Sequence, residues 1–221
     1  MDANQDHISQ LDQLTEQKRI QNTQYHAYTE NEMFHLYGSE LFSVLDFWRY
    51  KYGQLSGMAG EIAEFLIARA LGITKAENSD YWTAYDMSYR NKRIEVKATQ
   101  YVHPWNRKRI STARSFSIEP PHNSYWGTGT GSSRQSDIYV FCLDTNKDIS
   151  HADPLDLDTW EFYVIPTFRI DQYALGNGNP NQKKITLNVV RRLCTRPNGY
   201  DDLKGSIDAA IQESDQYYRN R

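Results

Sequence analysis

Two carboxylates and one amine stand close together in the chain, at Asp86 and in the tripeptide Glu95-Val96-Lys97. Carboxylate oxygens are the ligands that Mg²⁺ prefers, and a nearby cation can steady a water molecule that attacks a phosphate. These are the groups that a metal-dependent phosphodiesterase needs. The residue types and their spacing therefore make a nuclease the first hypothesis.

The position of the tripeptide is more informative than its sequence, because an acid, any residue and then lysine occurs three times in the chain. Glu16-Gln17-Lys18 falls in a polar arm, and Asp202-Leu203-Lys204 opens a helical pattern. Only Glu95-Val96-Lys97 lies in a predicted strand, where alternation places Glu95 and Lys97 on one face. The alternative is an ordinary solvated strand face that carries a neighbouring Glu/Lys pair.

Positive charge is concentrated around the tripeptide, although the whole chain carries a formal charge of −3. That net charge argues against a protein that coats nucleic acid indiscriminately. His103 and Trp105 add stacking surfaces to a basic belt, which predicts a nucleic-acid contact, with a solvated turn as the alternative. Between residues 90 and 114 the belt sets one acid, Glu95, against eight basic residues: Arg90, Lys92, Arg93, Lys97, Arg107, Lys108, Arg109 and Arg114.

The length of 221 residues suits one domain with an appended arm. We expect residues 1–24, rich in Gln, Asp and Asn, to form a polar helical or disordered arm, and residues 25–221 to form the domain. No apolar stretch approaches the roughly 20 residues of a membrane helix, and no signal peptide is visible, so a soluble cytoplasmic protein is expected. Cys142, Cys194 and the six histidines match no disulfide or zinc pattern.

Two helices are predicted before the tripeptide. The first runs from Leu36 to Tyr52 and is capped by Ser39. The second runs from Ser56 to Gly72, and Glu61 lies about one residue round from its buried side, whereas Glu64 points elsewhere. The alternative reading of Glu61 is a first-turn acid favoured by the helix dipole. The buried stripe of the second helix is predicted to consist of Met58, Ile62, Phe65, Leu66 and Ala70.

The rest of the chain alternates between strand and helix patterns. A hairpin is predicted from 81–89 and 92–99, turning at Arg90-Asn91, with Asp86 in its first strand. A glycine- and serine-rich loop spans residues 120–133, and helices are predicted at 167–175 and 201–218. Further strands are predicted at 115–119, 137–143, 162–165 and 184–189.

The order of these parts resembles the PD-(D/E)XK nuclease superfamily, whose fold is restriction-endonuclease-like. The resemblance covers about residues 56–100, and Tyr85 stands where the family's name has a proline. It implies an α/β domain with a central mixed β-sheet flanked by helices. The matching segments are Gly57-Met58-Ala59-Gly60-Glu61 on a helix, Tyr85-Asp86 on one strand and Ile94-Glu95-Val96-Lys97-Ala98 on the next.

The resemblance also implies the roles of the site residues. Asp86, Glu95, the Val96 carbonyl and Glu61 would bind Mg²⁺, with Mn²⁺ as a substitute, and Lys97 would orient or help deprotonate the attacking water. Gln100, Arg134 and Gln135 are auxiliary candidates that could equally be surface polar residues. Contacts to nucleic acid are expected at Arg93, Gln100, Trp105, Arg107, Lys108, Arg109, Arg114 and Arg134.

The implied function is a metal-dependent endonuclease that hydrolyses DNA to 5′-phosphate and 3′-hydroxyl ends, in a restriction or defence setting, with a homodimer as one arrangement. Three alternatives stay open. One is a nuclease directed at RNA. Another is a nucleic-acid-binding or scaffold module that has lost hydrolysis, and the third is a protein whose basic belt and glycine-rich loop contact another subunit.

Overall fold

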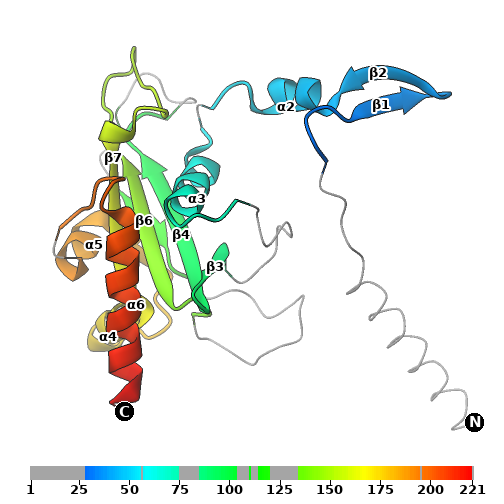
Figure 1. Cartoon of the computed structure of the whole chain (residues 1–221). Helices are drawn as coiled ribbons and strands as arrows, with labels where there is room; N and C mark the ends of the chain where they lie inside the picture. The colour runs from blue at the N-terminus through cyan, green and yellow to red at the C-terminus, as the bar shows by residue number, and fades with distance from the viewer. Residues whose placement is uncertain are drawn as a thin grey trace, which may run out of the picture. The chain divides into compact units, whose positions relative to one another are not determined.

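The computed structural model describes residues 28–55, 57–74, 85–103, 110, 114–119, 134–194 and 196–220. The chain divides into two compact units, residues 1–54 and residues 55–221 (Figure 1). The predicted boundary near residue 24 lies outside the described residues.

The first unit contains a β-hairpin where the sequence predicted a helix from Leu36. Strand β1 (Met33–Leu36) pairs antiparallel with β2 (Ser39–Ser43), and α2 (Val44–Tyr52) follows. Tyr37 and Gly38 both have positive φ, 51° and 80°, as the favoured two-residue hairpin turns require. The helix cap is therefore Ser43, which forms a capping box with Asp46, and the prediction of Ser39 was wrong.

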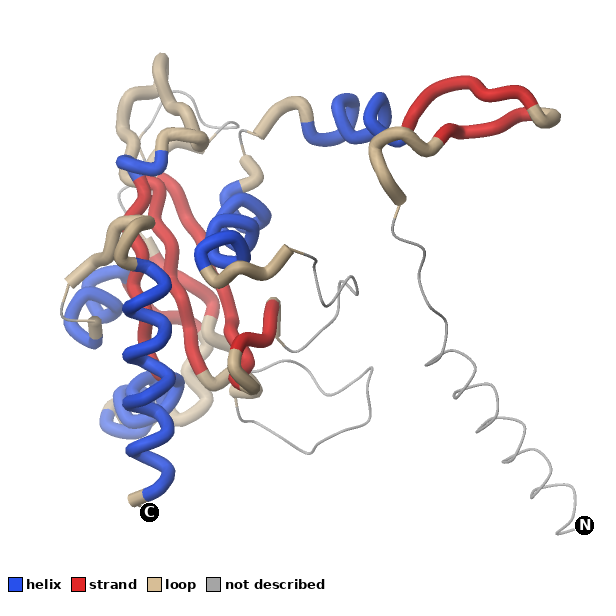
Figure 2. The backbone as a smooth tube through the Cα atoms, viewed as in Figure 1, coloured by secondary structure: helices blue, strands red, loops and turns tan. Residues whose placement is uncertain are grey.

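The second unit is built on a four-stranded mixed sheet in the order β3-β4-β6-β7 (Figures 1 and 2). Strand β3 (Met87–Tyr89) and β4 (Lys92–Gln100) form the predicted hairpin, and Arg90 and Asn91 turn it with φ of 50° and 60°. Asp86, predicted to lie in the first strand, instead directly precedes β3. Strand β6 (Ile138–Asp144) runs parallel to β4, with Ile94 opposite Ile138. Strand β7 (Trp160–Pro166) closes the sheet antiparallel to β6, after a short 3₁₀ turn at Leu157–Thr159.

Helices cover both faces of this sheet, as predicted. On one face Ile94, Val96 and Val140 pack with α3 (Ala59–Ala70) and α6 (Leu203–Arg219). On the other face Tyr139 and Phe141 pack with α4 (Thr167–Gly176) and α5 (Leu187–Leu193). A separate two-stranded sheet of β5 (Ser115–Ser117) and β8 (Lys184–Thr186) adds Phe116 and Ile185 to that second core. The unit is thus a mixed α/β structure with two apolar layers.

Two predicted elements differ in detail. The strand predicted at 184–189 ends at Thr186, and α5 begins at Leu187, because Leu187 and Val190 bury their side chains at helical spacing. Of the buried stripe predicted for α3, Leu66 is buried and Ile62 and Ala70 pack against the core, whereas Phe65 is 61% exposed. The prediction was therefore wrong at Phe65, and it missed the buried Ala63 and Ile67.

The remaining expectations that the described residues test are simpler. Helix α3 ends before Gly72, whose φ of 75° stops it as predicted. Both cysteines are free and buried in the core. Among the described residues, no helix combines the length and the apolar character that a membrane crossing requires.

Candidate functional site

Asp86 lies directly before β3, and its carboxylate contacts the backbone of β4 beyond the residues that pair with β3. The backbone N–H of Asp86 donates to the Ile94 carbonyl at 3.0 Å, and the Val96 N–H donates to Asp86 Oδ2 at 2.6 Å. Strand β3 pairs with β4 only as far as Ile94, so Val96 lies beyond the paired residues on that side. Within the part of the chain that the structure describes, no strand residue pairs with Val96 on that side, and the Asp86 side chain satisfies the Val96 N–H instead. The same bond fixes the Asp86 carboxylate against β4.

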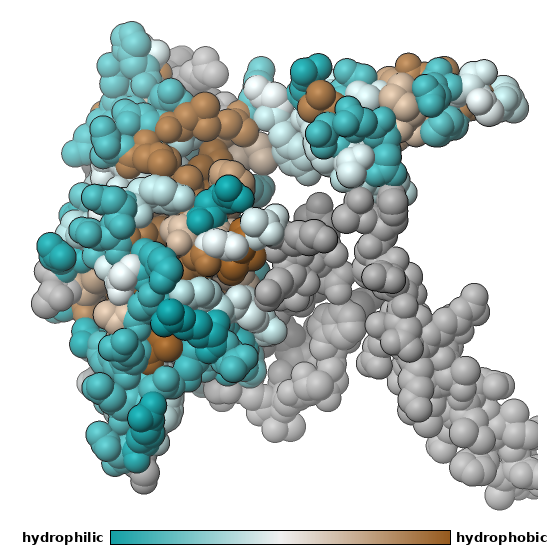
Figure 3. Space-filling view, in the orientation of Figure 1, coloured by the Kyte–Doolittle hydropathy of each residue, from teal (hydrophilic) through white to brown (hydrophobic). Residues whose placement is uncertain are grey.

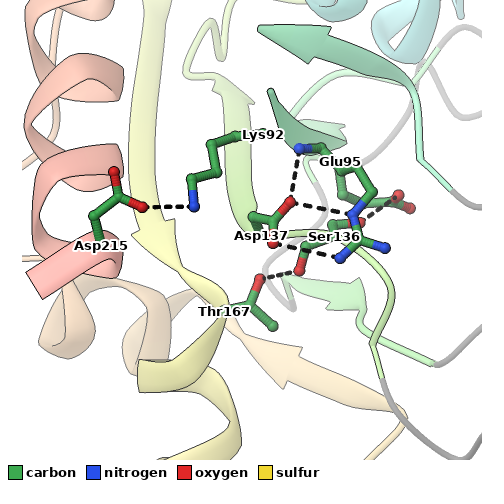
Figure 4. A network of polar contacts seen from close by, with 7 residues as sticks. Lys92, Glu95, Ser136, Asp137, Thr167 and Asp215 are labelled. Atoms are coloured by element: carbon green, nitrogen blue, oxygen red, sulfur yellow. Dashed lines mark hydrogen bonds and ion pairs between the residues drawn. The ribbon is translucent and has the colours of Figure 1, made fainter. Parts of the chain in front are cut away.

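Glu95 and Lys97 lie side by side on β4, as the alternation predicts. Val96 between them is buried on the opposite face, and Lys97 Nζ contacts Glu95 Oε1. The second carboxylate oxygen of Glu95 accepts a hydrogen bond from Ser136 Oγ at 3.3 Å. Figure 4 shows Ser136 between Glu95 and Thr167, whose Oγ1 donates to the Ser136 carbonyl at 2.7 Å. The carboxylate of Glu95 is therefore held from two sides.

Helix α3 brings a further carboxylate, Glu64, within electrostatic range of this site, although Glu64 is solvent-exposed. Desolvation of its carboxylate, then the charges of Asp86, Glu61 and Glu95, raise the pKa of Glu64 to about 7, while Lys97 opposes the shift. Glu64 stands three residues before the fully buried Ile67, on the same side of the helix. From the sequence Glu64 was expected to point elsewhere, and Glu61 was preferred because it ends the segment Gly57-Met58-Ala59-Gly60-Glu61 on which the resemblance rests.

The pKa values of the two strand carboxylates are also raised. Burial is the main cause at Asp86, where the hydrogen bond from Val96 and the charge of Lys97 oppose it. Burial is again the main cause at Glu95, reinforced by the charge of Asp86 and opposed by Lys97. The charge of Asp86 raises the pKa of Glu95 and that of Glu64, so the negative charges of these carboxylates repel one another.

These donors match the coordination habits of Mg²⁺. Among the described residues, no group of three His, Cys, Asp or Glu side chains is close enough to hold a metal together. Magnesium is commonly bound through one or two carboxylates and keeps several waters, which substrate phosphates can join. Asp86 and Glu95 supply two carboxylates, and each ionised carboxylate accepts more hydrogen bonds or ligand contacts than it uses here. The residues present fit that ion.

The described part of the basic belt is largely paired with acids that are distant in sequence. Two of these acids lie on α6, and the third lies directly before β6. Figure 4 shows Asp215 beside Lys92, and Asp137 near the start of β6. Neutralised side chains attract phosphate less than their number in the sequence suggests. The pairs are Arg90 with Asp208 at 3.0 Å, Lys92 with Asp215 at 2.6 Å and Arg93 with Asp137 at 3.1 Å.

The other predicted nucleic-acid contacts fall into two groups. Gln100, Arg114 and Arg134 are buried, each with less than a tenth of its surface exposed. The guanidinium of Arg114 stacks on the Tyr101 ring at 4.3 Å, and that of Arg134 donates to the Ile118 carbonyl at 3.0 Å. The structure thus places these three inside the fold. Four candidates lie outside the described residues: Trp105, Arg107, Lys108 and Arg109.

Glu61 is exposed in the first turn of α3, one turn before Glu64. Ser136 carried no local signal, because only the parallel register of β4 with β6 brings the start of β6 beside Glu95. Comparison with protein-family models, with curated proteins and with solved structures found no match.

Proposed function

We propose that the chain is a metal-dependent endonuclease that hydrolyses phosphodiester bonds of DNA. The observation that carries the proposal is the grouping of Asp86, Glu95 and Lys97 at the open edge of β4, with Glu64 in electrostatic range. An ordinary Glu/Lys pair on a solvated strand would not be accompanied by a second, partly buried carboxylate bound to the same strand. The resemblance to a restriction-endonuclease-like core rests on the same residues and on the mixed sheet.

In this proposal Asp86, Glu95 and the Val96 carbonyl hold Mg²⁺ or Mn²⁺, and Glu64 contributes directly or through water. The bound ion supplies a water of lowered pKa and neutralises charge on the phosphate. Lys97, held against Glu95, positions the attacking water and stabilises the negative charge that grows on the scissile phosphate. Asp86 keeps its orientation through the Val96 N–H, so the acceptor oxygens stay in place before substrate binds.

We propose that the enzyme acts in the cytoplasm, in restriction or defence. The nuclease activity itself is tested by incubating the purified protein with plasmid DNA, single-stranded DNA and RNA, each with Mg²⁺, with Mn²⁺ and with EDTA. Metal-dependent cutting of either DNA, abolished by EDTA, supports the proposal. Cutting of RNA alone would assign the site to RNA, and nucleic-acid binding without cutting of any substrate would indicate a binding module.

The two glutamates of α3 give a matched pair of variants. We expect Glu64→Gln to lower the Mg²⁺-dependent cleavage rate about 10- to 100-fold, because it removes a carboxylate close to Asp86 and Glu95. Both glutamates are exposed, but the charges of Asp86 and Glu95 act on Glu64, so Glu61→Gln, one turn earlier, is expected to have a much smaller effect. Single-turnover cleavage measures both. A larger loss at Glu61 than at Glu64 would contradict the assignment and return the role to Glu61.

A further inference from the structure

The first unit exposes a large amount of apolar surface for its size. Val44 is the one side chain of its described residues that is buried, and Phe47 and Trp48 of α2 are 45% and 36% exposed. A segment this small does not bury enough apolar surface to be stable alone. Ten of its large apolar side chains are exposed: Tyr28, Phe34, Leu36, Tyr37, Leu41, Phe42, Phe47, Trp48, Tyr50 and Tyr52.

Four of these side chains, Tyr28, Phe34, Phe47 and Trp48, line a groove between the hairpin and α2. The groove has a volume of about 620 Å³, and its lining includes Met33, Phe34, Val44, Phe47 and Trp48. The Phe34 ring lies 4.8 Å from the ring of Phe42 and 6.3 Å from that of Phe47, so strand and helix share one aromatic face. Figure 3 shows apolar residues on both α2 and the hairpin. Contiguous apolar patches of this kind mark interaction surfaces.

Backbone hydrogen bonds hold α2 against the segment that precedes the hairpin. The Val44 N–H donates to the Glu32 carbonyl at 2.8 Å, and the Leu45 N–H donates to the Glu30 carbonyl at 3.1 Å. These bonds tie the first turn of α2 to the segment before β1. The capping box of Ser43 and Asp46 fixes the same turn. The groove is therefore a formed feature, held by backbone hydrogen bonds.

The charges of the unit are arranged for pairing with an identical surface. Acidic residues lie in and before the hairpin and at the start of α2, whereas Arg49 and Lys51 lie in its last turn. A two-fold axis joins identical patches, so residue i of one copy meets residue j of the other and the reverse. With the two α2 helices antiparallel, the basic end of each copy meets the acidic end of its partner. The acids are Glu30, Glu32, Glu40 and Asp46.

We propose that this aromatic face binds the same face of a second copy of the chain, forming a two-fold symmetric dimer. Aromatic side chains carry much of the binding energy at protein interfaces, and opposite charges around them fix the orientation. A partner of uniform charge would satisfy only one end of the unit. The inference does not depend on the proposed nuclease activity, since it concerns only residues 28–54.

Sedimentation velocity of the full-length protein, without metal or nucleic acid, tests the proposal between about 1 and 100 µM. We expect a dimer in that range, and we expect Phe47→Glu to weaken dimerisation at least about 100-fold, since it places a charge in the aromatic groove. Leu175→Glu is the matched control, because Leu175 is 68% exposed on α4 of the other unit. Its dimer affinity should equal that of the wild type. Circular dichroism confirms that each variant is folded.

A charge exchange tests the two-fold geometry separately. Glu40→Lys and Lys51→Glu should each weaken the dimer on the order of ten-fold, and the double variant should recover most of the loss. A monomeric wild type at all concentrations would overturn the proposal, as would a dimer that Phe47→Glu leaves intact. A dimer that depends on Phe47 but whose double variant does not recover would overturn the antiparallel arrangement.

Discussion

Lys97→Ala will abolish most of the cleavage activity while leaving the fold intact. We expect the Mg²⁺-dependent rate to fall about 10²- to 10⁴-fold, the range typical of a lost group that transfers a proton or stabilises transition-state charge. The Lys97 side chain is 30% exposed and its ion pair is with its strand neighbour Glu95, so its removal breaks no link between elements. Single-turnover cleavage of plasmid DNA measures the rate, and thermal unfolding measures the fold.

Lys92→Ala is the control, because Lys92 is the same residue type on the same strand. Its Nζ forms an ion pair with Asp215 on α6 at 2.6 Å, and Asp215 is not a carboxylate of the candidate site. We expect it to change the cleavage rate only slightly. Equal losses for the two variants would mean that both lysines act by attracting the phosphate backbone, and the positioning role of Lys97 would be refuted. If Lys97→Ala kept full cleavage activity, Lys97 would have no role in catalysis.

The strand half of the candidate site was predictable from sequence because its geometry is local. Alternation along β4 places Glu95 and Lys97 on one face, and the hairpin turn at Arg90 and Asn91 sets the register that brings Asp86 beside Val96. These features span about a dozen residues, so the alternation and turn residues of one short segment are enough to predict them. The central sheet followed for the same reason, since β6 and β7 are apolar runs of ordinary strand length.

The helix half was not predictable at the same level. The phase of α3 depends on which apolar residues meet the sheet, and Phe65, the largest of them, remains 61% exposed. The buried side instead includes Ala63 and Ile67, and Glu64 lies in electrostatic range of the strand carboxylates. Hydrophobicity alone predicts that Phe65 and Ile67 are both buried. Only the packing of the helix against β4 distinguishes them.

The basic belt illustrates a second limit of sequence reasoning. Counting charges between residues 90 and 114 found a single acid, but folding pairs three of the basic residues with Asp137, Asp208 and Asp215. All three come from segments that lie more than forty residues away from their partners along the chain. A local charge count measures attraction to phosphate only when distant elements add no counter-charge. Here distant elements add three acidic residues, so the number of basic residues in the belt overstates its attraction to phosphate.

The second large effect that we expect concerns stability rather than activity. Arg134→Ala should lower the free energy of unfolding by about 3 kcal/mol, because it leaves buried hydrogen-bond acceptors without their donor. The Arg134 side chain is 2% exposed and donates to the carbonyls of Ile118 at 3.0 Å and Gln182 at 2.8 Å, and to Asp171 Oδ1. For a protein of this size the loss corresponds to about 6–12 °C in Tm, measured by calorimetry.

Asp171→Ala separates the carbonyl bonds from the ion pair. The Asp171 side chain is 50% exposed, so its pairing with Arg134 is screened by solvent and contributes about 0–1 kcal/mol. We therefore expect a small change in Tm for Asp171→Ala and a large one for Arg134→Ala, since Arg134 ties the segment after β5 to the turn before β8. If Arg134→Ala instead unfolded like the wild type and lost affinity for DNA, Arg134 would be a nucleic-acid contact, as the sequence first suggested. Its burial, and the two carbonyls that it bonds, favour the structural role.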